Sequence, residues 1–174
     1  IKTINKWAEK YGIKELKIND EKNFNIKQLC IFDTNIKHIP AAIFKLTNLK
    51  SLSIYCENLK QLPKEICNLI NLKKLYIHCE NLKSLINEIE RLTNLEFIRI
   101  ECENLKRLPK EIGNLINLKE LYIHCENLKS LTNEIEKLTN LESIHIECEN
   151  LKQLPKEIHN LIKLKRFDID CPNS

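Results

Sequence analysis

The chain has 174 residues, enough for one domain with a sizeable buried core. Its 28 basic and 24 acidic side chains are interspersed and leave a formal net charge of +4, so no basic block indicates a nucleic-acid partner. With two glycines and no apolar run of membrane-spanning length, the sequence argues against glycine-rich phosphate loops and against a membrane partner.

The first twelve residues have the pattern of an amphipathic helix. The apolar side chains on its predicted face are Ile1, Ile4, Trp7, Ala8 and Tyr11. Gly12 suits the C-terminal end of such a helix. We interpret residues 1–12 as a capping helix that covers the open end of the core, with Trp7 packed into that core rather than exposed to a ligand.

A period of 23 residues organises the chain from Ile13 onward. One unit runs from Leu49 to Asn71 and reads LKSLSIYCENLKQLPKEICNLIN. Three of the series that repeat at this step are Leu49, Leu72, Leu95, Leu118, Leu141 and Leu164; Cys56, Cys79, Cys102, Cys125, Cys148 and Cys171; and Asn35, Asn58, Asn81, Asn104, Asn127, Asn150 and Asn173. A constant register over so many units predicts a solenoid of stacked turns.

The spacing inside a unit predicts its local structure. Leu52 and Ile54 are two residues apart, which places both on the inner face of one short strand. Ile66 and Leu69 are three apart, which fits one side of a short helical or 3-10 segment. Stacked units would form a parallel sheet of about eight strands, counting a short first unit over 13–25.

A second period of 46 residues overlies the first. Residues 72–117 and 118–163 differ at only eight positions. Three of these differences fall on outward strand positions: Lys74/Glu120, Phe97/Ser143 and Arg99/His145. A block of two units has therefore been duplicated, and its later changes are enriched on the strand surface.

The unit resembles the leucine-rich repeat, LxxLxLxxNxLxxLPxxIxxLxx, and the resemblance covers residues 13–174 as a single domain. It implies an α/β right-handed horseshoe with a concave parallel sheet and short helical or 3-10 segments on the convex side. The chain is similar to Ras-group scaffold proteins and to effectors of intracellular bacteria. That similarity implies a monomeric protein-interaction module that scaffolds or inhibits an enzyme or host protein, in the cytoplasm or secreted by a bacterium into a host cytosol.

The outward strand positions are the candidate partner-binding residues. They carry aromatic and charged side chains of the types that anchor protein interfaces. The candidates are Phe32, Tyr55, Tyr76, His78, Phe97, Arg99, Glu101, Tyr122, His124 and His145. The alternative is that the aromatics only favour strands and pack across neighbours. Near the C-terminal end, Glu147, Asp168 and Asp170 would suit basic groups of a partner.

The cysteine series departs from the family pattern, which has Asn at the ninth position where this chain has Glu57 and its equivalents. Either the preceding cysteines turn inward as small apolar side chains while the following asparagines bond the backbone, or the cysteines lie at the sheet edge; we favour the first. Stacked thiols lie within disulfide range, but a uniform column favours reduced cysteines in a cytosol.

No motif predicts catalysis, a cofactor or a bound metal. The sequence lacks GxSxG, HExxH and P-loop patterns, and the HxE of His145 and Glu147 is followed by no PCxxC. His78–Cys79 and His124–Cys125 offer soft ligands without the short CxxC spacing typical of zinc sites. The competing hypotheses are a thiol-based redox or metal sensor and a recognition domain of a larger enzyme.

At the C-terminal end, either Pro172 and its neighbours shield the last strand or a cap is absent.

Overall fold

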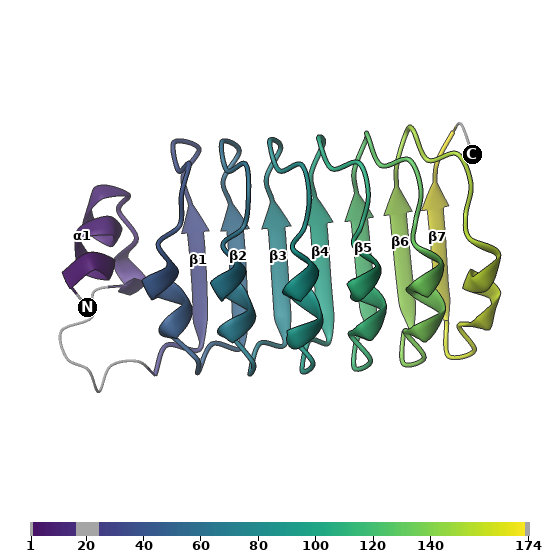
Figure 1. Ribbon diagram of the computed structural model, residues 1–174, viewed down its shortest axis with the longest axis horizontal. Helices are drawn as coiled ribbons and strands as arrows, with labels where there is room; N and C mark the ends of the chain where they lie inside the picture. Colours follow the sequence, from purple (N-terminus) through teal and green to yellow (C-terminus); the bar gives the residue numbers. More distant parts are fainter. Residues whose placement is uncertain (1, 17–24, 173–174) are drawn as a thin grey trace.

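A computed structural model describes residues 2–16 and 25–172, which form one open solenoid (Figure 1). The strands are β1 (Gln28–Phe32), β2 (Ser51–Tyr55), β3 (Lys74–His78), β4 (Phe97–Glu101), β5 (Glu120–His124), β6 (Ser143–Glu147) and β7 (Arg166–Asp170). They pair in sequence order, all parallel, and each residue lies opposite the residue 23 positions later. The predicted parallel sheet and its register are therefore confirmed.

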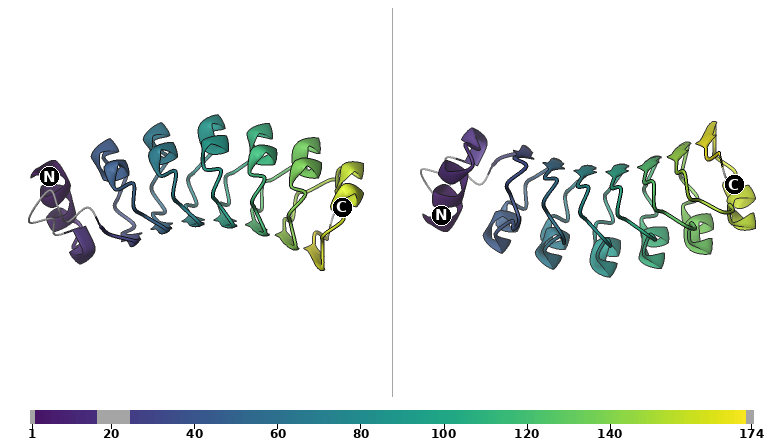
Figure 2. Two further views of the ribbon diagram at one scale, coloured as in Figure 1. Left: turned by 90° about the horizontal axis from the view of Figure 1, so that it is seen from below. Right: turned by 90° about the horizontal axis from the view of Figure 1, so that it is seen from above.

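Short 3-10 helices return the chain between strands. They are η3 (Ala41–Lys45), η4 (Lys64–Asn68), η5 (Asn87–Arg91), η6 (Lys110–Asn114), η7 (Asn133–Lys137) and η8 (Lys156–Asn160). In Figure 2 the solenoid is a gentle arc with the strands on its inner side and the 3-10 helices on its outer side. This arrangement is the predicted one.

The described residues form seven of the about eight predicted strands. The expected first strand begins where the chain instead makes a 3-10 turn, η1 (Lys14–Leu16). Residues 17–24 of this first unit lie outside the described residues.

The core is a single apolar column that runs through the solenoid. In β2 the second and fourth residues, Leu52 and Ile54, are fully buried, and the other three are half-buried. The 3-10 helices contribute buried isoleucines such as Ile66, and η4 starts after Pro63, whose φ of −63° matches the fixed ring geometry of proline. Among the described residues no polar or charged side chain is buried. The fold is thus held by apolar stacking between units.

The N-terminal helix α1 (Lys2–Lys10) lies beside the β1 end of the sheet (Figure 1). Gly12 has a φ of +66°, and the N–H groups of Gly12 and Ile13 donate to the carbonyls of Glu9 (3.3 Å) and Ala8 (2.8 Å). This pair of bonds is a Schellman motif, which ends the helix and explains the glycine. Trp7 packs against the core as predicted but is only half-buried, with its ring 5.3 Å from that of Tyr11.

Two side-chain ladders follow the strands. The asparagine after each Cys-Glu pair donates to a carbonyl of the preceding unit, as in Asn81 Nδ2 to Glu57 O (2.9 Å) and Asn104 Nδ2 to Glu80 O (2.9 Å). The cysteines point inward, with Cys56 Sγ 3.8 Å from Ile31 O. Of the two alternatives from the sequence, the inward thiol with a bonding asparagine is the observed one.

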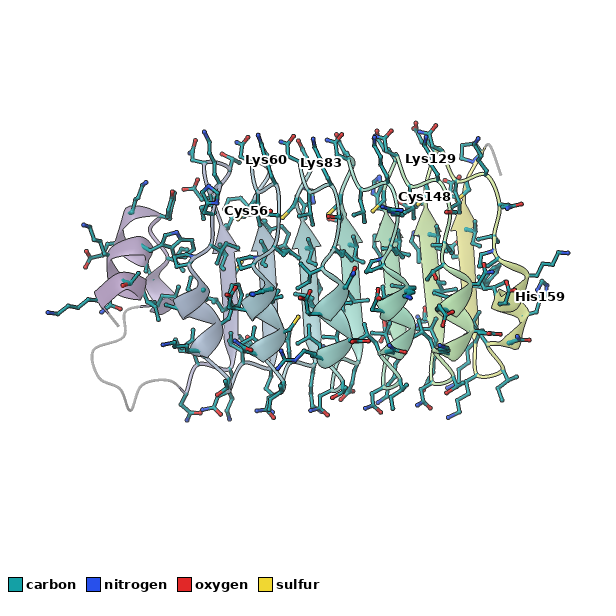
Figure 3. The ribbon with its side chains drawn as sticks, in the orientation of Figure 1. Cys56, Lys60, Lys83, Lys129, Cys148 and His159 are labelled. Atoms are coloured by element: carbon teal, nitrogen blue, oxygen red, sulfur yellow. The ribbon has the colours of Figure 1, made fainter. Side chains whose placement is uncertain are left out.

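Seven of the eight cysteines are buried, and none of the eight is joined in a disulfide. Burial raises the pKa of the Cys56 thiol to about 11 and that of Cys125 to about 12. Figure 3 shows Cys56 and Cys148 where the strands run into the upper turns, below Lys60, Lys83 and Lys129 at the rim. Because the thiolate is the reactive form, these cysteines are poor redox or metal-binding groups at neutral pH. Only Cys30, on β1, is exposed.

The C-terminal end of the core is uncovered by the described residues. Phe167, at an inward position of β7, is 50% exposed, and Ile162 in the preceding turn is 86% exposed. Pro172 is itself exposed and does not shield this edge. None of the helices in residues 2–16 and 25–172 has the length and apolarity needed to cross a membrane.

Thiol reactivity should reflect this burial. At about pH 8, a reagent such as DTNB should titrate one thiol rapidly in the native protein, because the buried thiols remain protonated and screened. Unfolding in guanidinium should release the other seven, and Cys30→Ser should abolish the rapid phase alone. Any rapidly reacting thiol in the native Cys30→Ser protein would contradict the inward column.

Gly113 should be indispensable to the packing of η6 against η7. A Cβ at this position would overlap the carbonyl oxygen of Glu134 and lie 2.9 Å from its Cβ. We expect Gly113→Ala to lower the free energy of unfolding by about 1–3 kcal/mol, because overpacking outweighs the entropy lost by the unfolded chain. Urea denaturation measures the change.

The matched control is His159→Ala, at the equivalent exposed position of the duplicated block, which should change stability by less than about 0.5 kcal/mol. Equal losses of stability in the two variants would show that the close approach of η6 to the Glu134 backbone does not require glycine at position 113.

Candidate protein-binding face

The first, third and fifth residues of β1–β7 form what we call the concave face. In β1–β6 these residues alternate with the buried second and fourth residues. The strands themselves line the inner side of the arc (Figure 2). All ten residues predicted from the sequence occupy this face: Phe32, Tyr55, Tyr76, His78, Phe97, Arg99, Glu101, Tyr122, His124 and His145. None of them belongs to the core.

Aromatic rings dominate the N-terminal part of the concave face. The ring of Tyr55 lies between those of Phe32 (6.0 Å) and His78 (5.9 Å). Phe32 is 70% exposed, far more than a side chain placed for packing alone. The face residues of β1 and β2 carry no formal charge. This end therefore offers an uncharged surface with two aromatic rings, one exposed and one half-exposed.

Stacked contacts connect the central strands. The rings of Tyr76 and Phe97 are 4.9 Å apart. The Arg99 guanidinium lies 4.0 Å from the centre of the Tyr122 ring, which also stacks in parallel on His145 at 4.6 Å. The rings thus do pack across strands, as the alternative interpretation held, and they contribute cation–π and stacking energy. They nevertheless remain half-exposed, so packing accounts for only part of their surface.

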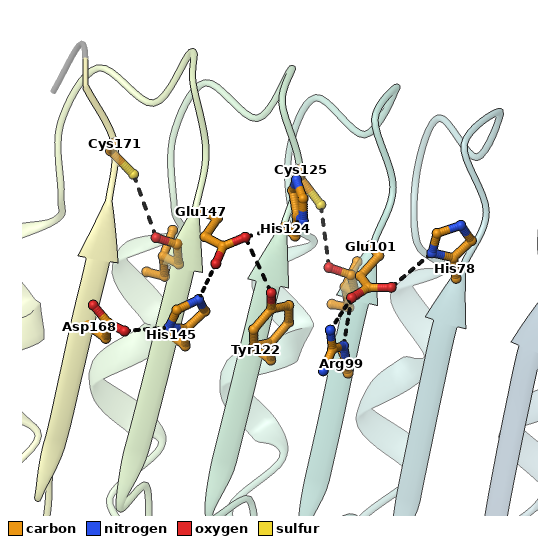
Figure 4. Close-up of polar contacts among 12 residues, drawn as sticks. His78, Arg99, Glu101, Tyr122, His124, Cys125, His145, Glu147, Asp168 and Cys171 are labelled. Atoms are coloured by element: carbon orange, nitrogen blue, oxygen red, sulfur yellow. Dashed lines mark hydrogen bonds and ion pairs between the residues drawn. The ribbon is translucent and has the colours of Figure 1, made fainter.

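Glu101 collects two basic groups. His78 Nδ1 lies 2.8 Å from Glu101 Oε2, and Arg99 Nε donates to Glu101 Oε1 at 2.7 Å (Figure 4). Burial raises the pKa of Glu101, but the hydrogen bonds from His78 and Arg99 outweigh it and hold the pKa below its ordinary value. The carboxylate is therefore ionised and fixed in orientation at neutral pH.

Glu147 has the same role two strands further on. It lies 2.7 Å from His145 Nε2 and 3.3 Å from His124 Nδ1, and it accepts a hydrogen bond from the Tyr122 hydroxyl at 3.3 Å (Figure 4). The hydrogen bond from His145 is the main cause of its lowered pKa. For Tyr122, burial and then the charge of Glu147 raise the hydroxyl pKa, which keeps the phenol neutral. His145 also reaches Asp168 through Nδ1, at 2.8 Å.

The sequence-based candidates omitted Glu147 and Asp168, which hold this network together. The signal was available, because a step of 23 places Glu147 opposite His124 and Asp168 opposite His145. From the sequence alone, these acids were expected only to form a charged C-terminal end that would suit basic groups of a partner.

Charge is distributed unevenly over the concave face. Four carboxylates but only one arginine lie on β5–β7: Glu120, Glu147, Asp168 and Asp170, with Arg166. A depression of about 200 Å³ opens beside them, lined in part by Glu126, Glu147 and Asp170. Within the described residues, no group of three or more His, Cys, Asp or Glu side chains could hold a metal ion. The concave face is therefore suited to binding a partner, with aromatic rings at its β1 end and carboxylates at its β7 end.

The ion pairs of Glu101 should give the stability a specific pH dependence. Glu101→Gln should lower the free energy of unfolding by about 1–2 kcal/mol at neutral pH, because it removes a charged acceptor. A pKa lowered by folding contributes stability above the ordinary value of 4.5 and loses it as the pH falls through the folded value. The stabilities of the native and Glu101→Gln proteins should therefore converge below about pH 4.5.

Urea titrations at stepped pH measure this difference. Glu120→Gln, on the same face, is the matched control and should change stability by less than about 0.5 kcal/mol. A Glu101→Gln deficit that stays constant down to strongly acidic pH would contradict the ionic origin of the effect.

Comparison with known proteins places the chain in a family. A family model described as a leucine-rich repeat region matches residues 9–130. A leucine-rich repeat protein of Leptospira interrogans has a similar structure, with 26% identity and a TM-score of 0.60 over 84% of this chain and 43% of that one. The chain thus spans less than half the length of that protein.

A second similar structure is the leucine-rich repeat domain of the type III effector XopL, at 20% identity and a TM-score of 0.46, with 87% of this chain and 70% of that one covered. No curated protein matches. Domains with this fold are typically non-catalytic modules that bind proteins. The matched family, the 23-residue register and the single parallel sheet agree, and the chain belongs to the leucine-rich repeat proteins.

Proposed function

We propose that this chain binds a protein partner through its concave face. The observation that carries the proposal is the half-exposed row of aromatic, imidazole and guanidinium groups that crosses β1–β6. The apolar column behind the sheet is complete without these side chains, so folding does not require their identities. Aromatic residues and arginine are the residue types enriched where protein interfaces carry most of their binding energy.

The preformed contacts on this face also support binding. The ion pairs of Glu101 and Glu147 hold several polar side chains in fixed orientations before any partner arrives. A pre-organised surface loses less conformational entropy on association than a mobile one. The gentle curvature further suits a protruding element of a partner rather than a flat surface (Figure 2).

As proposed, the chain binds its partner and does not itself catalyse a reaction. It scaffolds or inhibits its partner, an enzyme or a host protein, which is the role that the resemblance to Ras-group scaffolds and bacterial effectors implies. The inward column of small apolar cysteines suits a reducing compartment such as a cytosol, where stacked thiols are not oxidised to disulfides. The buried cysteine column disfavours the alternative thiol sensor, because its pKa values lie far above neutral pH.

The concave face should account for partner capture. The triple variant Tyr76→Ala, Phe97→Ala and Tyr122→Ala should retain its circular dichroism and weaken capture of a protein from lysate by at least about tenfold, because hot-spot side chains are lost. Affinity purification with quantitative mass spectrometry measures the loss.

The matched control removes exposed apolar side chains elsewhere, with Ile70→Ala and Ile116→Ala, which are 52% and 54% exposed in the turns before β3 and β5. Unchanged capture by the triple variant, or equal loss in the control, would reject the concave face as the binding surface.

A further inference from the structure

The concave face carries twice a group made of a tyrosine, a histidine, a basic residue and a glutamate. On β3 and β4 the group is Tyr76, His78, Arg99 and Glu101. On β5 and β6 it is Tyr122, His124, His145 and Glu147. In each copy the tyrosine and histidine stand two apart on one strand, and a basic group and a glutamate stand opposite them on the next.

The two copies share two contacts and differ at the tyrosine, since Tyr76 packs on Phe97 while Tyr122 stacks on His145 and donates to Glu147. In each, the histidine of the first strand faces the glutamate of the second, at 2.8 Å for His78–Glu101 and 3.3 Å for His124–Glu147. In each, the basic group of the second strand pairs with the glutamate two residues on, through Arg99 or through His145. The face therefore presents two similar groups of side chains, displaced by two strands.

This displacement sets the repeat distance of a matching ligand. Neighbouring strands are about 4.8 Å apart, so two strand intervals are about 9.6 Å. A polyproline II helix repeats every three residues with a rise of about 3.1 Å each, or about 9.3 Å per turn. An extended strand repeats its side chains at about 6.6–6.8 Å, and two α-helical turns span about 10.8 Å. Of these, the polyproline II helix fits best.

The chemistry of the face agrees with the spacing. Polyproline II segments dock on aromatic surfaces and, being pre-formed, lose little entropy when bound. Phe32 and Tyr55 supply an uncharged aromatic end, and Tyr76 and Phe97 continue it. Carboxylates at the opposite end, such as Asp168 with its side chain 72% exposed, complement positive charge. This complementarity fixes which end of the ligand lies over β7.

We propose that the partner contributes a polyproline II segment that crosses the strands, with its basic end over β6 and β7. Six strand intervals span about 29 Å, which corresponds to about nine residues in this conformation. The proposal rests on the proposed function and adds the conformation and charge of the bound element. It assigns Glu147 and Asp168 to the basic end and Tyr76 and Tyr122 to successive turns of the helix.

Defined peptides test this proposal on the full chain. The probes are two fluorescein-labelled peptides of about nine prolines with two arginines at one end or the other, a length set by the span of the sheet. One control replaces the arginines with glutamates, and a second keeps the arginines on a flexible Gly-Ser backbone. Fluorescence anisotropy should show that at least one proline–arginine peptide binds, and that either control binds at least about tenfold more weakly.

Substitutions in the chain locate the site. Tyr76→Ala with Tyr122→Ala, and separately Glu147→Gln with Asp168→Asn, should each weaken the proline–arginine peptide by at least about tenfold while circular dichroism stays unchanged. The second pair removes charge without removing volume, so it remains informative where loss of the rings perturbs folding. The matched controls, Ile116→Ala and Glu111→Gln, should leave the affinity unchanged because neither residue lies on the concave face.

Equal binding of the Gly-Ser peptide would overturn the proposal, because only charge would then be recognised. No binding of either proline–arginine peptide up to about 1 mM would also overturn it. If the triple aromatic variant loses partner capture while these peptides fail, the proposed function stands and only the polyproline conformation is rejected. If the peptides bind but the face variants bind them equally well, the assigned site is rejected.

Discussion

The structure depends on apolar stacking between units that cannot fold alone. A 23-residue unit has one short strand, one short 3-10 helix and a few leucines and isoleucines, too few to enclose an interior of their own. Burial becomes complete only when the unit before and the unit after supply the remaining walls. The register of the strands, the direction of the turns and the outward exposure of every second strand residue all follow from this shared burial.

Polar groups are fitted to that stack without interrupting it. The asparagine ladder satisfies the carbonyls of the upper turns from one unit to the next. Its position one residue later than in the usual repeat is compensated by the cysteine that turns inward, where its small apolar side chain fills the space and its thiol points to a carbonyl. The unusual sequence of this turn thus preserves the two physical requirements, a filled interior and satisfied backbone groups.

Most of the fold was accessible from the sequence because the pattern recurs in constant register. The inward positions of Leu52 and Ile54, the parallel pairing and the cap ended by Gly12 follow from periodicity and from the freedom of glycine at positive φ. The first unit was less predictable, because a single irregular copy offers no register to compare, and η1 forms where a strand was expected. The half-exposure of Trp7 depends on how closely α1 approaches the solenoid, which no local pattern encodes.

The candidate site was predictable in position but not in detail. The period locates each outward side chain, and strand register shows that Glu147 faces His124. It does not show which rotamers bring Arg99 over Tyr122 or stack Tyr122 on His145, because those choices depend on the size and charge of several neighbours at once.

The duplicated block has an evolutionary consequence. Because residues 72–117 and 118–163 are nearly the same and equal two whole turns of the solenoid, recombination between them would gain or lose 46 residues without changing the phase of any later turn. Lineages could therefore lengthen or shorten the concave face in steps of two strands. The two ends of the solenoid, and the residues in contact where one block meets the next, would keep the same chemistry.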